Sequence, residues 1–405
     1  MDKIPVTVIS GFAGAGKTTL LRHLLTGLEG KRTATFLSDL GHGEADNGLC
    51  ETATPGIIHC KSREHLGMEL RKLGRARSWD HLIIESTGGS EPLPVAECLV
   101  VDDGRGTPVS RYVQIDTLIT VVDAERFLAD YASSDTLKSR GLAASDGDAR
   151  TVVEALVAQV ELADVIVINK VDRAGEAQLG ELAAMLAELA PRAAVLRAEQ
   201  GKVPVSEILN TGRFNFDAAR ELLGTSGWFD RAEAPAQGAF RSFGYRRFRP
   251  FHPARFEELI HGDWSDVVRS KGTFWVASRP DAAGEWWQAG KVVHHATAGS
   301  FWAATPESEW EIADVRKAKI KAVWQEPYGD RRQELALVVR GEARAAVERR
   351  LDACLLTDEE MALGPQGWTA LSAQDHEDGH DDEQNEHAHP ERFQGHSPAD
   401  GHHMQ

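Results

Sequence analysis

The chain has 405 residues, of which 45 are Lys or Arg and 62 are Asp or Glu, so its formal charge at pH 7 is −17. This length predicts two or three domains with cores of their own and excludes a single small domain. The acidic balance argues against nucleic acid and against a membrane surface as partners, because both attract an excess of basic side chains.

Features of exported and membrane proteins are absent from the sequence. It has no run of 18 or more apolar residues, and its first residues lead into a strand-like segment rather than a signal peptide. Its four cysteines are too few and too scattered for a disulfide framework at this length. We therefore expect a cytoplasmic protein in a reducing compartment.

The first 225 residues alternate short β-branched runs with segments of helical periodicity. Buried strands are predicted at residues 6–10, 33–37, 81–84, 118–122 and 165–168. Helices are predicted from about Thr18 and across residues 152–162, where apolar residues recur at helical spacing. This alternation predicts an α/β domain over residues 1–225, with a mainly parallel sheet covered by helices on both faces.

Beyond residue 225 the composition changes. Residues 226–239 are rich in Ala, Pro and Gly and predict a linker, and seven of the ten tryptophans lie between Trp264 and Trp324. Alternating segments at 272–277 and 334–339, with a helical pattern at 340–351, predict a smaller α+β domain with antiparallel strands over residues 240–374.

The last segment, residues 375–405, holds seven of the sixteen histidines, nine acidic residues and one Arg. It has too little apolar surface to offset a backbone ordering cost of about 1–2 kcal/mol per residue, so we expect it to be disordered. Its histidines favour weak, exchangeable binding of zinc, nickel or copper, although a merely solubilising extension is the alternative. These residues are His376, His380, His387, His389, His396, His402 and His403.

A phosphate-binding loop follows the first predicted strand. Residues 11–18 read GFAGAGKT and match the pattern G-x-x-x-x-G-K-[ST] between a strand and a helix. Backbone N–H groups of such a loop surround the phosphates, Lys17 reaches the β and γ oxygens, and the Thr18 hydroxyl ligates Mg²⁺. The predicted phosphate-binding set is Gly11, Gly14, Ala15, Gly16, Lys17, Thr18 and Thr19. A glycine-rich turn without a ligand is the alternative.

A base-reading motif follows the strand predicted at 165–168. Asn169, Lys170 and Asp172 form the pattern N-K-x-D, which resembles the guanine motif of GTPases. The Asp172 carboxylate can accept hydrogen bonds from guanine N1–H and the 2-amino group, a donor pair that adenine lacks. GTP is therefore the predicted nucleotide. A plain turn is the alternative, and an ATPase remains possible only if Asp172 faces away from the base.

The strand predicted at 81–84 is followed by further candidate site residues. Glu85 is placed to hold the water shell of Mg²⁺, and Gly88 can offer its N–H to the γ-phosphate. With Lys17 and Thr18 they form the predicted catalytic set; a solvated Glu at a strand end is the alternative reading. Since no residue is assignable as an arginine finger or for positioning the attacking water, we expect slow turnover.

These motifs, in this order, make the chain resemble the CobW-like GTPases, a family whose members deliver or insert metal ions, often zinc. Further matching blocks are Glu91-Pro92, Gln159, Ala163-Asp164, residues 249–256, residues 269–275 and residues 329–335. The resemblance implies a GTPase domain followed by an α+β C-terminal domain. It also implies GTP, Mg²⁺ and Zn²⁺ or another divalent transition metal as ligands, and a client metalloprotein as partner.

The sequence departs from the family at its metal motif, which is usually Gly-Cys-x-Cys-Cys. The matching segment here reads GIIHC, so only His59 and Cys60 remain as ligand types at this place. His42, with Asp39 or Cys50, is a candidate to complete an altered site. Loss of the site, with His59 and Cys60 as ordinary loop and core residues, is the alternative.

The leading functional hypothesis is a GTP-hydrolysing metallochaperone in which GTP changes the affinity for metal or client. Two alternatives stay open: an activator that inserts cobalt or iron into one enzyme, such as a nitrile hydratase, and a nucleotide-binding metal buffer with negligible turnover.

Overall fold

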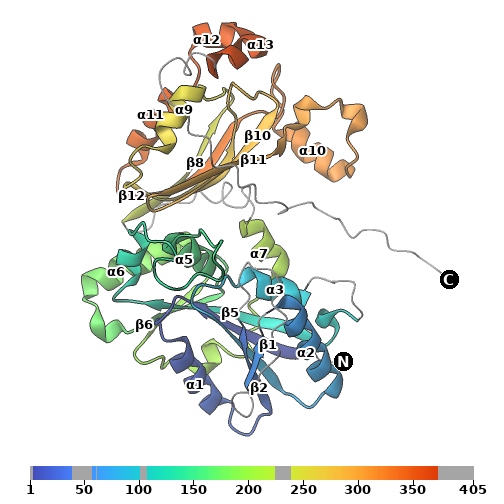
Figure 1. Ribbon diagram of the computed structural model, residues 1–405, viewed down its shortest axis with the longest axis vertical. Helices are drawn as coiled ribbons and strands as arrows, with labels where there is room; N and C mark the ends of the chain where they lie inside the picture. The colour runs from blue at the N-terminus through green and yellow to red at the C-terminus, as the bar shows by residue number, and fades with distance from the viewer. Residues whose placement is uncertain (1–2, 39–56, 61, 101–106, 224–238, 373–405) are drawn as a thin grey trace, which may run out of the picture.

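The computed structural model describes residues 3–38, 57–60, 62–100, 107–223 and 239–372. The described chain forms two lobes, one around a parallel sheet and one around an antiparallel sheet (Figure 1). Residues 226–238 of the predicted linker and all of the predicted tail lie outside the described residues. The prediction of a parallel α/β fold followed by a smaller antiparallel α+β fold is confirmed.

The first sheet has seven strands in the order β3-β2-β4-β1-β5-β6-β7, and all of its pairs are parallel. The strands are β1 (Ile4–Gly11), β2 (Thr33–Ser38), β3 (Ile57–Cys60), β4 (His81–Ser86), β5 (Val113–Asp123), β6 (Val165–Asn169) and β7 (Ala194–Ala198). The five predicted strands are all present, and each is longer than predicted by one or more residues. The strands β3 and β7, at the two edges, were not predicted.

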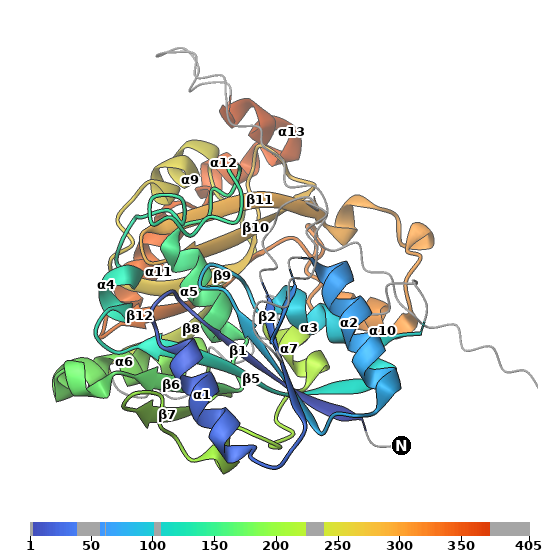
Figure 2. The ribbon, with the colours of Figure 1, turned by 60° about the horizontal axis from the view of Figure 1, so that its bottom comes forward.

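Helices cover both faces of this sheet (Figure 2). They are α1 (Lys17–Gly27), α2 (Arg63–Ala76), α3 (Leu93–Val100), α4 (Phe127–Tyr131), α5 (Val152–Glu161), α6 (Glu176–Leu189) and α7 (Phe216–Leu223). Leucines of α1 share one buried cluster with alternate residues of the central strands. The intervening strand residues, which point to the opposite face of the sheet, pack against α2 and α3 in one cluster and against α5 and α6 in another. Each strand therefore contributes side chains to a core on either face of the sheet.

The second sheet is antiparallel, with the order β11-β10-β9-β12-β8. Its strands are β8 (Phe240–Arg247), β9 (Val267–Phe274), β10 (Ala282–Ala289), β11 (Val292–Ser300) and β12 (Gln333–Arg340). The helices of this lobe are α9 (Pro253–Ile260), α10 (Asp314–Ala322), α11 (Arg344–Ala353), α12 (Asp358–Ala362) and α13 (Gly364–Trp368). One face packs on α9 and α11 through a cluster of aromatic side chains that includes Trp264 and Trp286.

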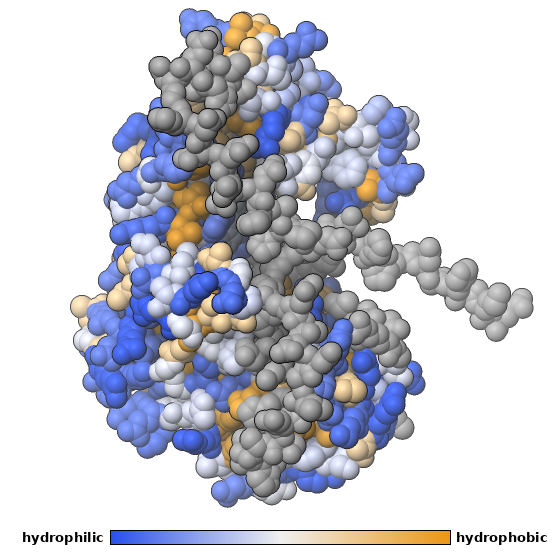
Figure 3. Space-filling model, in the orientation of Figure 1, coloured by the Kyte–Doolittle hydropathy of each residue, from blue (hydrophilic) through white to orange (hydrophobic). Residues whose placement is uncertain are grey.

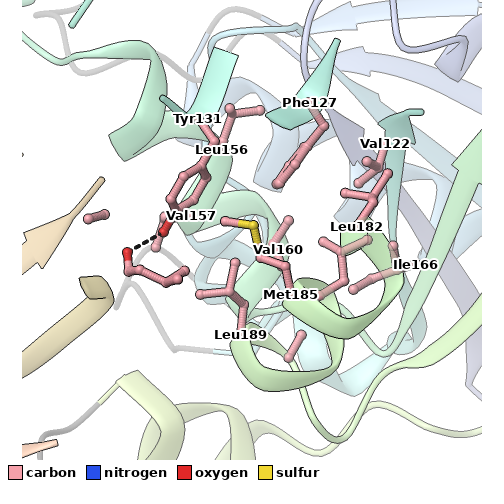
Figure 4. Close-up of a cluster of buried hydrophobic side chains, with 14 of the residues drawn as sticks. Val122, Phe127, Tyr131, Leu156, Val157, Val160, Ile166, Leu182, Met185 and Leu189 are labelled. Carbon is pink, nitrogen blue, oxygen red and sulfur yellow. Dashed lines mark hydrogen bonds between the residues drawn. The ribbon is translucent and has the colours of Figure 1, made fainter. Parts of the chain in front are cut away.

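The other face of the second sheet meets α5 and α6 of the first lobe. Val268 and Val338 belong to the same buried cluster as Val160 and Met185. Figure 4 shows Met185 among side chains of α5 and α6, and the Tyr131 hydroxyl donates a hydrogen bond of 2.7 Å to the Val268 carbonyl oxygen. A shared core therefore joins the two lobes.

The face drawn in Figure 3 is mainly hydrophilic, with small hydrophobic areas. Among the helices that the structure describes, none combines the length and the apolar character needed to cross a membrane.

Candidate nucleotide site

The predicted phosphate loop lies between β1 and α1, at the carboxyl end of the central strand. Gly11, Gly14 and Gly16 all have positive φ, at 137°, 76° and 107°. A Cβ at Gly11 would lie 2.3 Å from the Val121 carbonyl oxygen, and one at Gly16 would lie 2.2 Å from the Asn169 Nδ2 atom. Only glycine fits these two places, because both the backbone conformation and the space forbid a side chain. The loop can thus turn its backbone N–H groups toward an anion at the start of α1.

Lys17 lies over this loop and is buried. Its Nζ atom donates to the carbonyl oxygens of Gly11 at 2.8 Å and Phe12 at 3.1 Å. Burial lowers the pKa of Lys17 to about 8, while the negative charge of Glu85 opposes this shift. The ammonium group is therefore held by two neutral carbonyl oxygens. A charged phosphate oxygen makes a stronger hydrogen bond and can replace them as its partner.

Thr18 and Glu85 meet at the end of the loop. The Thr18 hydroxyl donates to Glu85 Oε1 at 2.7 Å, across 67 residues of sequence. Glu85 is only 5% exposed, and its Oε2 atom has no hydrogen-bond partner among the described residues. A buried carboxylate oxygen without a donor is costly, so the pair fits Mg²⁺ and its water ligands, which supply the missing partners.

Gly88 approaches the phosphate loop from the segment after β4. A Cβ at Gly88 would lie 2.6 Å from the Ala13 backbone nitrogen, so no larger residue fits there. The following Gly89 is equally restricted, because its Cβ would lie 2.5 Å from the Leu142 carbonyl oxygen. The sequence prediction placed Gly88 in this neighbourhood, and the structure brings it beside the loop.

The base-reading motif follows β6 on the other side of the loop. Asn169 is buried, and its Nδ2 atom donates to the Ala15 carbonyl oxygen at 2.9 Å. Lys170 has φ of 61° and its Nζ atom lies 2.6 Å from Asp123 Oδ2. Asp172, in a short 3₁₀ turn, is exposed. The structure thus gathers the phosphate loop and the N-K-x-D motif at one edge of the sheet.

Sequence reasoning missed the loop after β7. The Gly201 backbone N–H donates to Asn169 Oδ1 at 2.9 Å, and a Cβ at Gly201 would lie 2.8 Å from the Leu20 backbone nitrogen. No short motif marks this loop. Recognition of β7 as a strand would have placed the loop beside the base-reading motif, at the carboxyl edge of the sheet.

Comparison with known proteins identifies the family. Residues 5–197 match the nucleotide-binding domain model of CobW/HypB/UreG, and residues 240–355 match the CobW C-terminal domain model. A zinc-regulated GTPase metalloprotein activator from Dictyostelium discoideum is 36% identical over 394 residues, covering 91% of this chain and 83% of its own. This chain belongs to the CobW family of P-loop GTPases.

Two further proteins are similar to the chain at lower sequence identity. A zinc chaperone from Mycobacterium tuberculosis is 29% identical, and the match covers 77% of this chain and 76% of that protein. The zinc-bound YjiA GTPase from E. coli has a solved structure with 20% identity and a TM-score of 0.38, which covers 88% of this chain and 100% of that chain.

The segment predicted as an altered metal motif, residues 56–60, falls partly on β3. The strand Ile57–Cys60 pairs with β2, so that Cys60 lies opposite Ser38, and Cys60 is fully buried. His42 and the tail histidines lie outside the described residues, and the structure says nothing of the His59 side chain. Within the described residues, no group of three or more His, Cys, Asp or Glu side chains could hold a metal ion. The predicted transition-metal sites stay predictions.

Proposed function

We propose that this CobW protein is a cytoplasmic, GTP-hydrolysing metallochaperone that transfers a divalent transition metal, with zinc as its expected cargo, to client metalloproteins. The observation that carries the proposal is the strand register. Cys60 lies opposite Ser38, and Ser38 lies opposite Ser86, the residue after Glu85. Two strand spacings separate Cys60 from Ser86, or about 10 Å. The names of the relatives, a zinc-regulated activator and a zinc chaperone, support zinc.

In the proposed nucleotide complex, the phosphate loop surrounds the β-phosphate and γ-phosphate with N–H groups, and Lys17 moves from its carbonyl partners to the phosphate oxygens. Thr18 and Glu85 would hold Mg²⁺, which neutralises phosphate charge when it is bound. Asp172 accepts hydrogen bonds from the guanine base. Asn169 holds the phosphate loop in place through the hydrogen bond from its Nδ2 atom to the Ala15 carbonyl oxygen.

Hydrolysis breaks the bond between the β–γ bridging oxygen and the γ-phosphorus as water attacks. Lys17 stabilises charge on the phosphate oxygens, and the Gly88 N–H donates to the γ-phosphate. After hydrolysis, GDP offers the Gly88 N–H no γ-phosphate. The segment 85–91 is then free to relax, and we propose that this change reaches the neighbouring strands β2 and β3 and the metal they carry.

A zinc titration tests this coupling in the full chain. Zinc affinity is measured by competition with a chromophoric chelator, once with Mg²⁺ and GDP and once with Mg²⁺ and a non-hydrolysable GTP analogue. We expect a difference of about fivefold or more, since binding couplings of 1–3 kcal/mol are typical. The His59→Ala/Cys60→Ala variant should lose this difference while the tail still binds zinc. Equal zinc affinities in the wild-type protein would overturn the proposal.

Base recognition is tested by Asp172→Ala. Loss of the carboxylate removes both hydrogen bonds to guanine, so we expect GTP affinity to fall about 100-fold, with little change for ATP. Affinities for both nucleotides are measured by fluorescence with labelled analogues. Glu176→Ala, which changes a nearby exposed carboxylate at the start of α6, is the matched control and should leave both affinities unchanged. An unaltered preference for GTP in Asp172→Ala would contradict the assignment.

A further inference from the structure

A buried glutamine lies behind the segment that carries Gly88. Gln159, on α5, is 1% exposed. Its Nε2 atom donates to the Gly88 carbonyl oxygen at 3.1 Å and to the Ser90 carbonyl oxygen at 3.0 Å. Both N–H groups of the amide are therefore used on the two carbonyls that flank Gly89.

The rest of Gln159 is fixed by other contacts. Its own carbonyl oxygen accepts a 2.6 Å hydrogen bond from the Thr120 hydroxyl on β5. The helix that carries it begins with a capping box between Thr151 and Glu154. The backbone of Gln159 is thus held by helix α5 and by the central strand β5. The carbonyl oxygens that its side-chain amide binds belong to the loop after β4.

The side-chain oxygen of Gln159 points to the purpose of this contact. Oε1 is buried and has no hydrogen-bond partner among the described residues. Burial of an oxygen without a hydrogen-bond donor is unfavourable, so a glutamine that only filled the core would be less stable there than an apolar side chain of the same size. The side-chain amide of Gln159 donates its hydrogen bonds to residues 88 and 90, so its contribution is concentrated on that segment.

Gly88 and Gly89 need such a restraint. Glycine has more backbone freedom than any other residue, and two in succession would sample many conformations unless held. Space forbids a side chain at either position, so the chain cannot be stiffened by substitution. The two N–H groups of Gln159, bound to the carbonyl oxygens of Gly88 and Ser90, restrict the backbone of both glycines without a side chain at either position.

We propose that Gln159 is a positioning residue for GTP: it preorganises the Gly88–Ser90 backbone so that the Gly88 N–H meets the γ-phosphate. The inference rests on the proposed role of Gly88. GDP has no γ-phosphate, so the contribution of Gln159 is specific to GTP and to the hydrolytic step.

The test compares two nucleotides in the full chain. Gln159→Met keeps the length of the side chain and removes both donors. With Mg²⁺ present, we expect its affinity for a non-hydrolysable GTP analogue to fall roughly tenfold, its GDP affinity to stay within about twofold, and kcat to fall. If Gln159→Met does not fold, Gln159→Asn, which keeps the amide but is one methylene too short, replaces it with the same expectation.

Gln288→Met is the matched control. Gln288 is also fully buried, and its Nε2 atom also donates to two carbonyl oxygens, those of Val267 at 3.0 Å and Gly290 at 2.7 Å, but in the second lobe. We expect this variant to lose stability without a change in the ratio of GTP to GDP affinity.

The outcomes separate the inference from the proposed function. If the wild-type protein binds the GTP analogue and GDP equally, the Gly88 N–H gives GTP no advantage and the role of Gln159 is overturned, while the zinc titration still decides the proposed function. If the wild-type protein distinguishes the two and Gln159→Met distinguishes them to the same extent, the switch stands and the role of Gln159 is overturned. A parallel loss of both affinities in Gln159→Met would also overturn it, because a general structural role would produce that result.

Discussion

At the scale of single residues, Asn169 connects loops that are far apart in sequence. Its Nδ2 atom binds the Ala15 carbonyl oxygen, 154 positions away, and its Oδ1 atom accepts from the Gly201 N–H, 32 positions away. Both bonds are buried, so the side chain uses a donor and an acceptor where water cannot replace it. Asn169 thereby supports the phosphate loop and connects it to the loop after β7.

Replacement of Asn169 by Ala is expected to weaken GTP and GDP binding alike. The change leaves the Ala15 carbonyl and the Gly201 N–H without partners, at a cost of about 1–3 kcal/mol for each buried group. Calorimetry of both nucleotides and denaturant unfolding measure the two effects. Asn215→Ala is the control, since Asn215 accepts from the Ala218 N–H at an exposed helix start and its loss costs about 1 kcal/mol. Selective loss of GTP binding in Asn169→Ala would contradict this role.

At the scale of elements, β4 begins with a buried histidine. His81 is 1% exposed, and its Nε2 atom lies 2.9 Å from the Thr7 hydroxyl on β1. Burial lowers the pKa of His81 to about 4, although the charge of Asp116 opposes the shift. The native state therefore keeps this imidazole neutral at a pH where the unfolded chain, with a pKa near 6.5, takes up a proton.

The sign of this difference predicts acid sensitivity. The contribution of neutral His81 to the free energy of unfolding is fully present above pH 6.5. It falls as the pH decreases toward 4, by about 3 kcal/mol over the whole range. His81→Gln cannot take up this proton, so we expect the free energy of unfolding to vary less between pH 6.5 and 4 than in the wild-type protein. Urea unfolding across this range provides the comparison, and equal slopes for the two proteins would rule out His81 as the source.

The elements also show what sequence could predict. The five central strands are strongly apolar and β-branched, and the phosphate loop is contiguous, so local patterns sufficed for both. The edge strands were missed for physical reasons. β3 has only four residues, in a segment that the sequence analysis interprets as a metal motif, and β7 is partly exposed, with Arg197 as its fourth residue of five. Gln159 was part of a matching family block, but its bonds to residues 88 and 90 depend on tertiary packing.

At the scale of the whole molecule, a buried charge cluster joins the lobes two residues beyond Gln159. Glu161 Oε1 lies 2.8 Å from Arg269 Nε, and Glu161 Oε2 lies 3.4 Å from Lys271 Nζ. All three side chains are buried. Burial alone would raise the pKa of Glu161, but the two cations hold that pKa below its ordinary value. One helix thus contacts the Gly88 segment and the second lobe.

Removal of the Glu161 charge is expected to destabilise the contact between the lobes. Glu161→Gln leaves two buried cations without their carboxylate, a change that typically costs about 3–5 kcal/mol. We expect a lower midpoint in calorimetric unfolding and a separation of the single transition into two, because the second sheet loses an anchor on α5. The interface would stay partly formed through the apolar cluster of Val268, Val338 and α5.

An exposed ion pair across the same interface provides the control. Arg340 Nη1 and Glu181 Oε1 lie 2.8 Å apart, but the two side chains are 44% and 43% exposed. Because water screens such a pair, Glu181→Gln should change the free energy of unfolding by no more than about 1 kcal/mol and leave one transition. If the two variants had equal effects, burial of the Glu161 cluster would not be what holds the lobes together, and the apolar contacts alone would account for their association.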